Sequence, residues 1–323
     1  MANYRKRAIL SFCQSSTIIR AVTDGKGESM LLKYLRTQIE NRVKNWLLRL
    51  TSSPLLGYLP PFVPYESGRN TYMIPVAAHP EGRRVSHDFP VPPKELWLGY
   101  GTTAEVYLEA GRHHVNRMLQ ITEGSGWSLP ADARVMDFGC GAGRMARWLV
   151  EKVPDGEIWG TDISAPHITW CQQNLTPPIH FVTTTTMPHL PFEDNSFDFI
   201  YAGSVFSHLD DLADAWLLEL RRIARPSSRI FITIMDQTSI SLFSQDKWKN
   251  FWLSWYVLAH REYRTYLSAQ FSKFTIGRAL QAQVFYNRDE LARKLTRWFT
   301  VHSVVPEAYA FQTALVLEKN RDE

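Results

Sequence analysis

Three glycines at alternate positions follow an acidic residue near the middle of the chain, in the segment V-M-D-F-G-C-G-A-G at 135–143. Glycine reaches positive φ and has no Cβ to keep a ligand away from the backbone. The apolar pair before Asp137 predicts a short buried strand. A helix after the turn would offer unpaired N–H groups and a positive dipole end, which suits a nucleotide-like ligand with a carboxylate or phosphate. The apolar face of that predicted helix is Met145, Ala146, Trp148, Leu149 and Val150.

The spacing of the glycines decides which ligand the turn suits. The dinucleotide fingerprint G-x-G-x-x-G would need its last glycine at Arg144 or at Ala146, so this fingerprint is absent. The pattern D-x-G-x-G-x-G, here D-F-G-C-G-A-G, instead resembles motif I of the class I S-adenosylmethionine-dependent methyltransferases. This resemblance implies that the turn binds S-adenosyl-L-methionine, with contacts from Asp137, Gly139, Cys140, Gly141 and Gly143.

A second acidic residue follows at the distance that nucleotide-binding folds use. Residues 157–164 predict a strand that ends at Asp162, and the acid that meets the ribose lies about 20 residues after the glycines in related folds. A carboxylate can accept hydrogen bonds from both ribose hydroxyls. The alternative is a helix N-cap, because Ile-Ser-Ala-Pro follows. The upstream glycines favour a ribose contact at Asp162, with Ile163 beside it.

The next two predicted strands lead to the adenine and to the reactive end of the cofactor. Aligning L-P-F at 190–192 with the same wording in the family places Thr186 where many members carry an aspartate for the adenine amine. Met187 falls where a small residue is usual, so the adenine contact departs from the family pattern. After the strand at 197–201, the resemblance places Gly203 and Ser204 near the sulfonium.

His208 lies just beyond them and is the predicted general base, because an imidazole titrates near working pH. A structural histidine is the competing interpretation. The N/D-P-P-Y/F motif of many methyltransferases that act on amino groups of nucleic acids and of glutamine is missing here. Its absence weakens the interpretation of a nucleic-acid base as acceptor.

A helix from Thr102 or Thr103, as N-cap, to about Ile121 precedes the glycine turn. In the resembled family this helix flanks the methionine end of the cofactor, which implies contacts from Tyr107 and Arg112. Arg112 could meet the methionine carboxylate, and a plain surface arginine is the alternative. Gly111 inside the helix indicates either close approach of a neighbour or a break.

Composition bounds the remaining possibilities. The chain has 323 residues, 45% of them hydrophobic and 21% charged, as in ordinary globular proteins. No apolar run reaches the roughly 18–20 residues that cross a bilayer. The three cysteines form no disulfide or zinc pattern, which favours the cytoplasm, and no carboxylate or histidine spacing predicts a metal. Residues 1–50 contain ten Lys/Arg and three Asp/Glu. This excess of positive charge indicates either a solvated basic face or an arm that binds anionic partners.

The order of elements predicts an α/β fold, a Rossmann-like three-layer sandwich. The expected sheet has seven strands, mostly parallel with an antiparallel edge strand. Residues 1–95 form an N-terminal extension with a basic amphipathic helix over about 30–50 and a Pro-rich segment over 51–93. Residues 96–323 form the methyltransferase domain, with a helical, aromatic-rich insertion over about 237–285. The insertion is either a lid over the acceptor or a packing and dimer surface.

The predicted function is methyl transfer to an O, N or C nucleophile of a small-molecule acceptor. Two alternatives stay open: methylation of RNA or protein guided by the basic arm, and a non-catalytic module that binds the cofactor. A homo-oligomer through the N-terminal helix or the insertion is also possible.

Overall fold

The computed structural model describes residues 88–248, 250–259, 271–277 and 282–320, together with positions 39, 42 and 43. The basic helix predicted over 30–50 and most of the Pro-rich segment 51–93 lie outside these ranges, apart from those three positions, which are helical, and residues 88–93. The chain divides into two units, Met1–Ser53 and Pro54–Glu323. The architecture below is that of the second unit.

The sheet has the predicted seven strands. Their spatial order is β3-β2-β1-β4-β5-β9-β8, and β3 to β5 run parallel, while β9 is antiparallel to both of its neighbours. The order reverses between β1 and β4, and open α/β sheets bind ligands at the carboxyl ends of the strands at such a reversal. The strands are β1 Arg134–Phe138, β2 Glu157–Asp162, β3 Ile179–Thr183, β4 Phe197–Ala202, β5 Ala224–Ile234, β8 Phe299–Tyr309 and β9 Gln312–Lys319.

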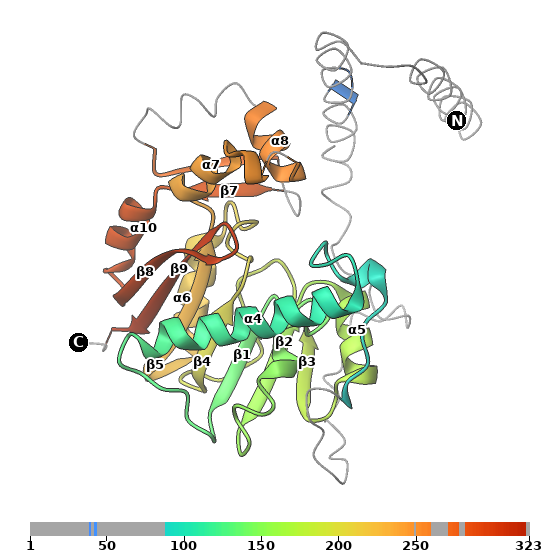
Figure 1. Ribbon diagram of the computed structural model, residues 1–323. Coiled ribbons are helices and arrows are strands. Elements are labelled where there is room, and N and C mark those ends of the chain that lie inside the picture. The colour runs from blue at the N-terminus through green and yellow to red at the C-terminus, as the bar shows by residue number, and fades with distance from the viewer. Residues whose placement is uncertain are drawn as a thin grey trace, which may run out of the picture. The chain divides into compact units, whose positions relative to one another are not determined.

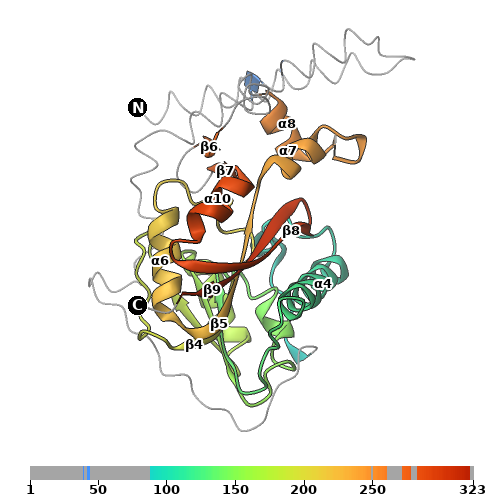
Figure 2. The ribbon, with the colours of Figure 1, turned by 90° about the vertical axis from the view of Figure 1, so that its left-hand side faces the viewer.

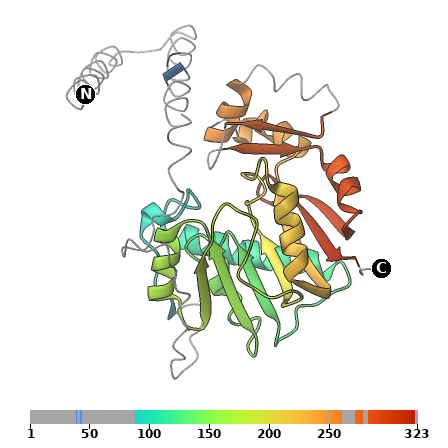
Figure 3. The same cartoon turned by 180° about the vertical axis from the view of Figure 1, so that it is seen from behind.

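Helices cover both faces of this sheet, as the view along its edge shows (Figure 2). Helices α4 (Ala104–Glu123) and α5 (Ala165–Asn174) pack with the short η3 (Ala146–Trp148) on one face. Helices α6 (Ala213–Ile223) and α10 (Arg288–Leu295) cover the other. Figure 1 shows α4 crossing in front of the strands, and Figure 3, which views the molecule from behind, shows α6 in front of them on the opposite face. Successive strand residues therefore alternate between two cores, which confirms the three-layer prediction.

Side chains cap the N-termini of α4 and α10, and the cap of α4 is the predicted Thr103. The Thr103 hydroxyl accepts a hydrogen bond from Val106 N, and Asn287 Oδ1 accepts one from Glu290 N. At the amino end of β5 the pairing with β4 shifts register, and Ser227 there has a φ of 64°. Within the ranges that the structure describes, no helix has the length and apolar character needed to cross a membrane.

The insertion after β5 is only partly helical, contrary to the prediction. It contains a two-stranded antiparallel sheet, in which the rings of Phe274 and Phe285 stack at 4.8 Å between centroids. Phe243 packs beside them and forms with Met235, Ile240 and Val257 a third core. In the described part of the insertion most aromatic residues thus pack against one another, while Trp252 is exposed. The elements are η2 Lys94–Leu96 before the domain, then α7 Gln237–Phe243, η4 Asp246–Trp248, α8 Trp252–Ala259, β6 Lys273–Ile276 and β7 Gln283–Tyr286 in the insertion.

Candidate functional site

The glycine turn begins where β1 ends, as predicted. Gly139, Gly141 and Gly143 have φ values of 79°, 51° and 69°, a region that favours glycine. The N–H groups of Gly139 and Cys140 both donate to the carbonyl of Thr161, which ties the turn to β2. The strand and the turn of the predicted motif are therefore present, and the backbone conformation explains why all three positions are glycine.

The helix expected after the turn is wrong: the chain forms tight turns and the single 3₁₀ segment η3. Its bonds include three-residue steps such as Trp148 N to Met145 O, as in 3₁₀ structure. This segment is also bonded to a distant part of the chain, because the buried Arg147 guanidinium donates to the carbonyls of Phe89 and Pro90. The expected apolar residues are still buried, apart from Trp148, which is half-buried.

The three glycines lack a side chain for different reasons. A Cβ on Gly139 would lie 2.3 Å from Val205 Cγ2, and one on Gly143 would lie 2.4 Å from Leu175 Cδ1. A side chain at Gly139 would therefore clash with Val205, and one at Gly143 would displace the end of the Leu175 side chain. A Cβ on Gly141 would meet only Leu98 Cδ1 at 3.4 Å and His167 Cδ2 at 3.9 Å, which is ordinary contact. The bare backbone at Gly141 is therefore the part of the turn that packing does not explain.

Asp162 lies beside Gly141. Its Oδ2 accepts a hydrogen bond from Gly141 N and its Oδ1 accepts one from Ser164 N, both at 2.8 Å. The carboxylate thus supports the turn and the backbone just before α5. The N-cap of α5 is Ser164, so the interpretation of Asp162 as the helix N-cap is wrong. A carboxylate has about four lone-pair positions, so two remain for a ligand. The side chain is only half-buried, which leaves it accessible.

The carboxyl end of β4 lies next to the glycine turn across the reversal of strand order. Ser204 has a φ of 62°, unusual for a serine, and its N–H donates to Thr233 Oγ1 at 2.7 Å. Gln312 Nε2 donates to Ser204 Oγ at 2.8 Å, and Thr233 Oγ1 donates to Gln312 Oε1 at 2.7 Å. Three side chains thus fix an unusual backbone turn at the predicted reactive end.

His208 follows on the same loop and is exposed. Its Nδ1 lies 2.9 Å from the carbonyl of Ala282 in the insertion, so Nδ1 carries the proton and the lone pair is on Nε2. Surrounding protein atoms lower the pKa of His208, and the Ala282 carbonyl opposes part of that shift. The ring is thus neutral near pH 7, with an acceptor nitrogen available. The insertion is joined to this loop elsewhere: Val284 N donates to the Ser207 carbonyl.

Helix α4 approaches the turn closely at Gly111. A Cβ there would lie 2.4 Å from the Arg144 carbonyl, so the close approach that the sequence predicted is made by the protein itself. The structure does not bring Arg112 to the turn, because it pairs with Glu109 and both side chains are more than half exposed. Tyr107 is buried with its ring stacked on Trp97 at 5.1 Å.

Arg144, which the sequence did not single out, lies at the centre of a polar cluster. The side chain is 6% exposed, and Nη2 donates to the Tyr309 hydroxyl at 2.5 Å and lies 3.1 Å from His114 Nδ1. The guanidinium carbon is 4.0 Å from the centre of the Tyr100 ring. Burial, then the Arg144 charge, lower the pKa of His114 to about 3, so this ring is neutral. The sequence signal is a pair of arginines, Arg144 and Arg147, inside an otherwise apolar run.

Asp137 is the second buried charged group at this end of the sheet. It is 3% exposed, and its Oδ2 has no hydrogen-bond partner in the part of the chain that the structure describes. Burial raises the pKa of Asp137 to about 7, while the neighbouring Tyr201 hydroxyl and Arg144 guanidinium oppose the shift. A buried acceptor left without a partner is costly, so this oxygen fits a site that a ligand completes.

The remaining predicted contacts surround this centre. Cys140 is a buried free thiol within the turn, and Ile163 follows Asp162. Gly203 packs against Tyr309, whose Cε2 would lie 3.2 Å from an added Cβ. Thr186 and Met187 are exposed on the loop after β3, with Met187 64% exposed. No group of three metal-binding side chains occurs among the residues with described positions.

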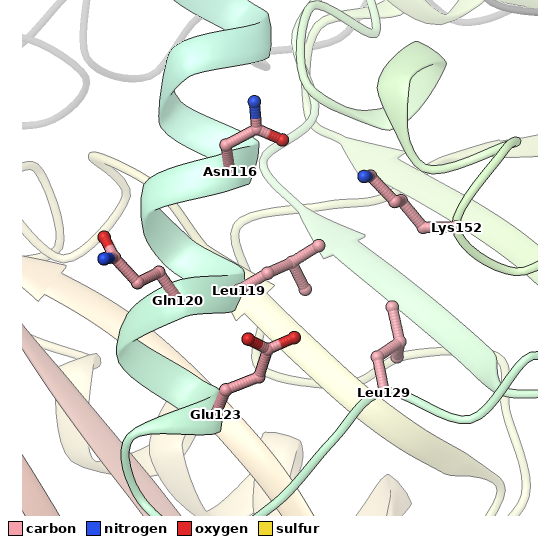
Figure 4. A pocket seen from close by; sticks show the side chains of 6 residues that line it. All are labelled: Asn116, Leu119, Gln120, Glu123, Leu129 and Lys152. Carbon is pink, nitrogen blue, oxygen red and sulfur yellow. The ribbon is translucent and has the colours of Figure 1, made fainter.

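A surface pocket also occurs at the other end of β1 (Figure 4). Side chains of α4 line one side of it, and Leu129 and Lys152 lie opposite. It contains none of the residues of the glycine turn. The α4 residues that line it are Asn116, Leu119, Gln120 and Glu123.

Comparison with known proteins agrees with this geometry. Residues 136–232 match the family model described as a methyltransferase domain. The matched segment starts on β1 and ends on β5, so it includes the glycine turn, Asp162 and the β4 loop. Residues 136–232 therefore carry a methyltransferase domain.

Curated relatives are similar over part of the chain. A demethylmenaquinone methyltransferase of Lactiplantibacillus plantarum is 34% identical over 107 residues, which cover 32% of this chain and 45% of that protein. A 2-phytyl-1,4-naphtoquinone methyltransferase of Trichormus variabilis is 25% identical over 201 residues, 53% of this chain and 77% of that protein. The alignment thus spans less than half of the first relative and about three quarters of the second.

Solved structures are similar at a lower level. A magnesium protoporphyrin IX methyltransferase from Synechocystis, solved with bound S-adenosylhomocysteine, is 15% identical with a TM-score of 0.44, covering 69% of this chain and 91% of that one. A 1,6-didemethyltoxoflavin-N1-methyltransferase from Burkholderia thailandensis is 16% identical with a TM-score of 0.43, covering 66% and 79%.

Proposed function

We propose that this chain is a methyltransferase that transfers a methyl group from S-adenosyl-L-methionine to an O, N or C nucleophile of a small-molecule acceptor. The observation that carries the proposal is Gly141, whose missing side chain packing does not require and whose N–H is bonded to Asp162. Bare backbone beside an accessible carboxylate, at the reversal of strand order, fits the sugar and thioether of an adenosyl ligand. The names of the curated relatives support a small-molecule acceptor.

The residues present fit the cofactor. Asp162 and Ile163 would hold the ribose, and the turn with Gly203 and Ser204 would hold the sulfur end. The adenine would lie at the loop of Thr186 and Met187. When bound, the cofactor supplies an electrophilic methyl group, so the protein has to align the acceptor's lone pair and exclude water. We propose that the methyltransferase domain spans 96–323 and that residues 1–95 are an N-terminal extension. We also propose that the protein acts in the cytoplasm. It would form a homo-oligomer through the N-terminal helix or the insertion.

His208 is proposed as the general base for an acceptor that stays protonated until attack. Its Nε2 carries a lone pair because the Ala282 carbonyl holds the proton on Nδ1. The residue lies four positions after Ser204, on the loop at the carboxyl end of β4. A base in this position takes the acceptor's proton as the bond to the methyl group forms.

For His208→Asn we expect kcat to fall about 10²- to 10⁴-fold, the usual contribution of a general base. The asparagine amide can still donate to Ala282, so the loop should keep its position. In the wild type, kcat should fall at acidic pH as the imidazole is protonated, and because the pKa is lowered this fall begins below the ordinary histidine range. In the variant the acidic limb should vanish. Turnover assays across a range of pH measure kcat and its acidic limb for the wild type and the variant. A variant that keeps the wild-type acidic limb would contradict the role of His208 as general base.

The test of the proposed function itself is calorimetry followed by turnover. The folded chain should release or absorb heat on titration with S-adenosylmethionine and with S-adenosylhomocysteine, each at a stoichiometry of about one. A methyl-labelled cofactor offered with phenolic, amine and quinol acceptors should then yield a labelled small molecule. Absence of binding to either compound would refute the proposal. Binding without transfer to any acceptor would favour a non-catalytic module.

A further inference from the structure

Four consecutive residues of the loop after β4, at 207–210, are each bonded to the insertion. The carbonyls of the first and the third accept hydrogen bonds at 2.9 and 3.1 Å, from Val284 N and from the Tyr286 hydroxyl. The second residue, His208, contacts the Ala282 carbonyl through Nδ1 at 2.9 Å. All three partners lie on β7 or directly before it. The loop and this strand therefore keep one register.

The fourth residue, Asp210, is bonded to the other strand of the hairpin, β6. Its Oδ1 accepts a hydrogen bond from Thr275 Oγ1 at 2.7 Å and lies 3.2 Å from Lys273 Nζ. The same ammonium donates to the Asp210 carbonyl. A partly exposed ion pair adds little to folding stability, whereas the hydroxyl contact fixes the direction of the carboxylate. Asp210 thus ties the end of the loop to β6, while β7 holds the three residues before it.

The start of the same loop is held by different elements. Ser204 N donates to Thr233 on β5, and Ser204 Oγ accepts from Gln312 on β9. The hairpin is itself anchored at the end of β5, because Tyr286 N donates to the Met235 carbonyl at 2.9 Å. A change on β6 can therefore shift the end of the loop and leave its start in place.

The register of the loop decides which nitrogen of His208 carries the proton. A carbonyl only accepts, so the contact with Ala282 requires the proton on Nδ1 and leaves the lone pair on Nε2. An imidazole free in water favours the opposite form, with the proton on Nε2. Gln283 Nε2 lies 3.4 Å from the same Nδ1, and a donation from that amide would also require the opposite form. The shorter contact, with Ala282, depends on the loop staying in register with the hairpin.

We propose that Asp210, Lys273 and Thr275 are positioning residues that hold His208 in the form protonated on Nδ1. The proposal rests on the proposed function, in which Nε2 of His208 takes a proton from the acceptor, and it deepens that function. The three residues act through the backbone of the loop, because the contact with the imidazole is made by Ala282. The hairpin is then a fixed part of the site, whereas a lid would have to leave the loop.

Proton–nitrogen NMR spectra of the imidazole rings test the proposal on the full chain, without cofactor or acceptor. The chain has ten histidines, and the signal that is absent from His208→Asn identifies the ring in question. At neutral pH the wild-type signal should be that of a ring protonated on Nδ1. In Asp210→Ala and in Thr275→Val it should shift toward the pattern of a ring protonated on Nε2.

Two control variants separate this effect from general damage. Thr275→Ser keeps the hydroxyl that donates to Asp210, so it should keep the wild-type spectrum. Asp214→Asn breaks another pair of an aspartate and a lysine, that between α6 and Lys294 of α10, and should also leave the His208 signal unchanged.

Turnover gives a second readout, with the phenolic, amine and quinol acceptors named above. Asp210→Ala should lower kcat about 10- to 100-fold, the scale of a reactive group misplaced by about 1 Å. Its affinity for S-adenosylhomocysteine should stay within about twofold of the wild type, because the start of the loop is held separately. In the His208→Asn background, Asp210→Ala should lower kcat by less than about twofold, because no base is left to position.

Three results would overturn the assignment. They are a wild-type ring protonated on Nε2, a wild-type signal kept in both Asp210→Ala and Thr275→Val, and a loss of kcat by the same factor with and without His208. Failure of the proposed function looks different. A chain that transfers no methyl group, or a His208→Asn variant with wild-type kcat, would refute that function, while the spectra would still decide whether the hairpin sets the protonated nitrogen.

Discussion

Replacing Gly141 by valine should abolish cofactor binding. The backbone at Gly141 is held in place by the Asp162 carboxylate, and its Cα faces space that packing does not fill beyond Leu98 and His167. A branched side chain would take the volume in which the ligand contacts the backbone. Titration with S-adenosylhomocysteine should give no measurable heat. The φ of 51° also costs a valine about 1–2 kcal/mol of folding stability, so a lower melting temperature is expected.

The effect on binding has to be separated from that cost. Gly126 offers the control, because it has a φ of 80° and nothing within 4 Å of an added Cβ, and it lies on the loop before β1, away from the turn. Gly126→Val should lose similar stability and keep its affinity. Gly141→Asn, in which asparagine tolerates positive φ, should keep stability and still lose affinity. Wild-type affinity in Gly141→Val would show that no ligand contacts this backbone.

Most of the fold follows from local patterns that the sequence displays directly. Strands such as Phe197–Ala202 are buried on both faces and appear as short apolar runs between turn residues, so they are recognisable without tertiary information. Thr103 and Asn287 mark helix starts for the same reason, because each cap is satisfied within three residues. Asp162 could also be predicted, because β1 and β2 are adjacent parallel strands and their carboxyl ends therefore lie at the same edge of the sheet.

Features set by contacts between distant segments could not be predicted. The helix expected after the turn is replaced by η3, and the partners of Arg147 there come from residues 89–90, more than fifty positions earlier. Strands β6 and β7 are four residues each, too short for their alternation to outweigh the helical spacing of the aromatic residues around them.

Arg144 shows the same limit at the site. Arg144 and Arg147 interrupt an apolar run, which indicates burial, but the partner of Arg144, Tyr309, is 165 residues away. For Arg112 the resemblance left two alternatives open, a contact with the methionine carboxylate and a plain surface arginine, and the sequence does not show that this side chain pairs with Glu109. Which side chains contact one another over such sequence separations is decided by the packing of the folded chain, so these contacts are known only from the structure.

For Asp162→Ala we expect the affinity for S-adenosylhomocysteine and for 5′-deoxy-5′-methylthioadenosine, which lacks the amino acid, to fall together by about 10- to 150-fold, since both compounds carry the ribose. Calorimetry with both ligands measures it. Asp198→Ala is the control, because Asp198 also accepts a backbone N–H, that of Arg134 at 2.8 Å, at the far end of the sheet. It should lower stability and leave both affinities unchanged.

Asp162 also holds Gly141 N, so a lost affinity could come from the turn and not from the ribose. A thermodynamic cycle with a 2′-deoxy form of methylthioadenosine separates the two causes. If the carboxylate binds the ribose, the wild type should discriminate against the deoxy ligand, and Asp162→Ala should bind the two forms almost equally. If the carboxylate only supports the turn, the variant would weaken both forms by the same factor. Discrimination that survives in Asp162→Ala would therefore remove Asp162 from the ribose site and leave it a purely structural role.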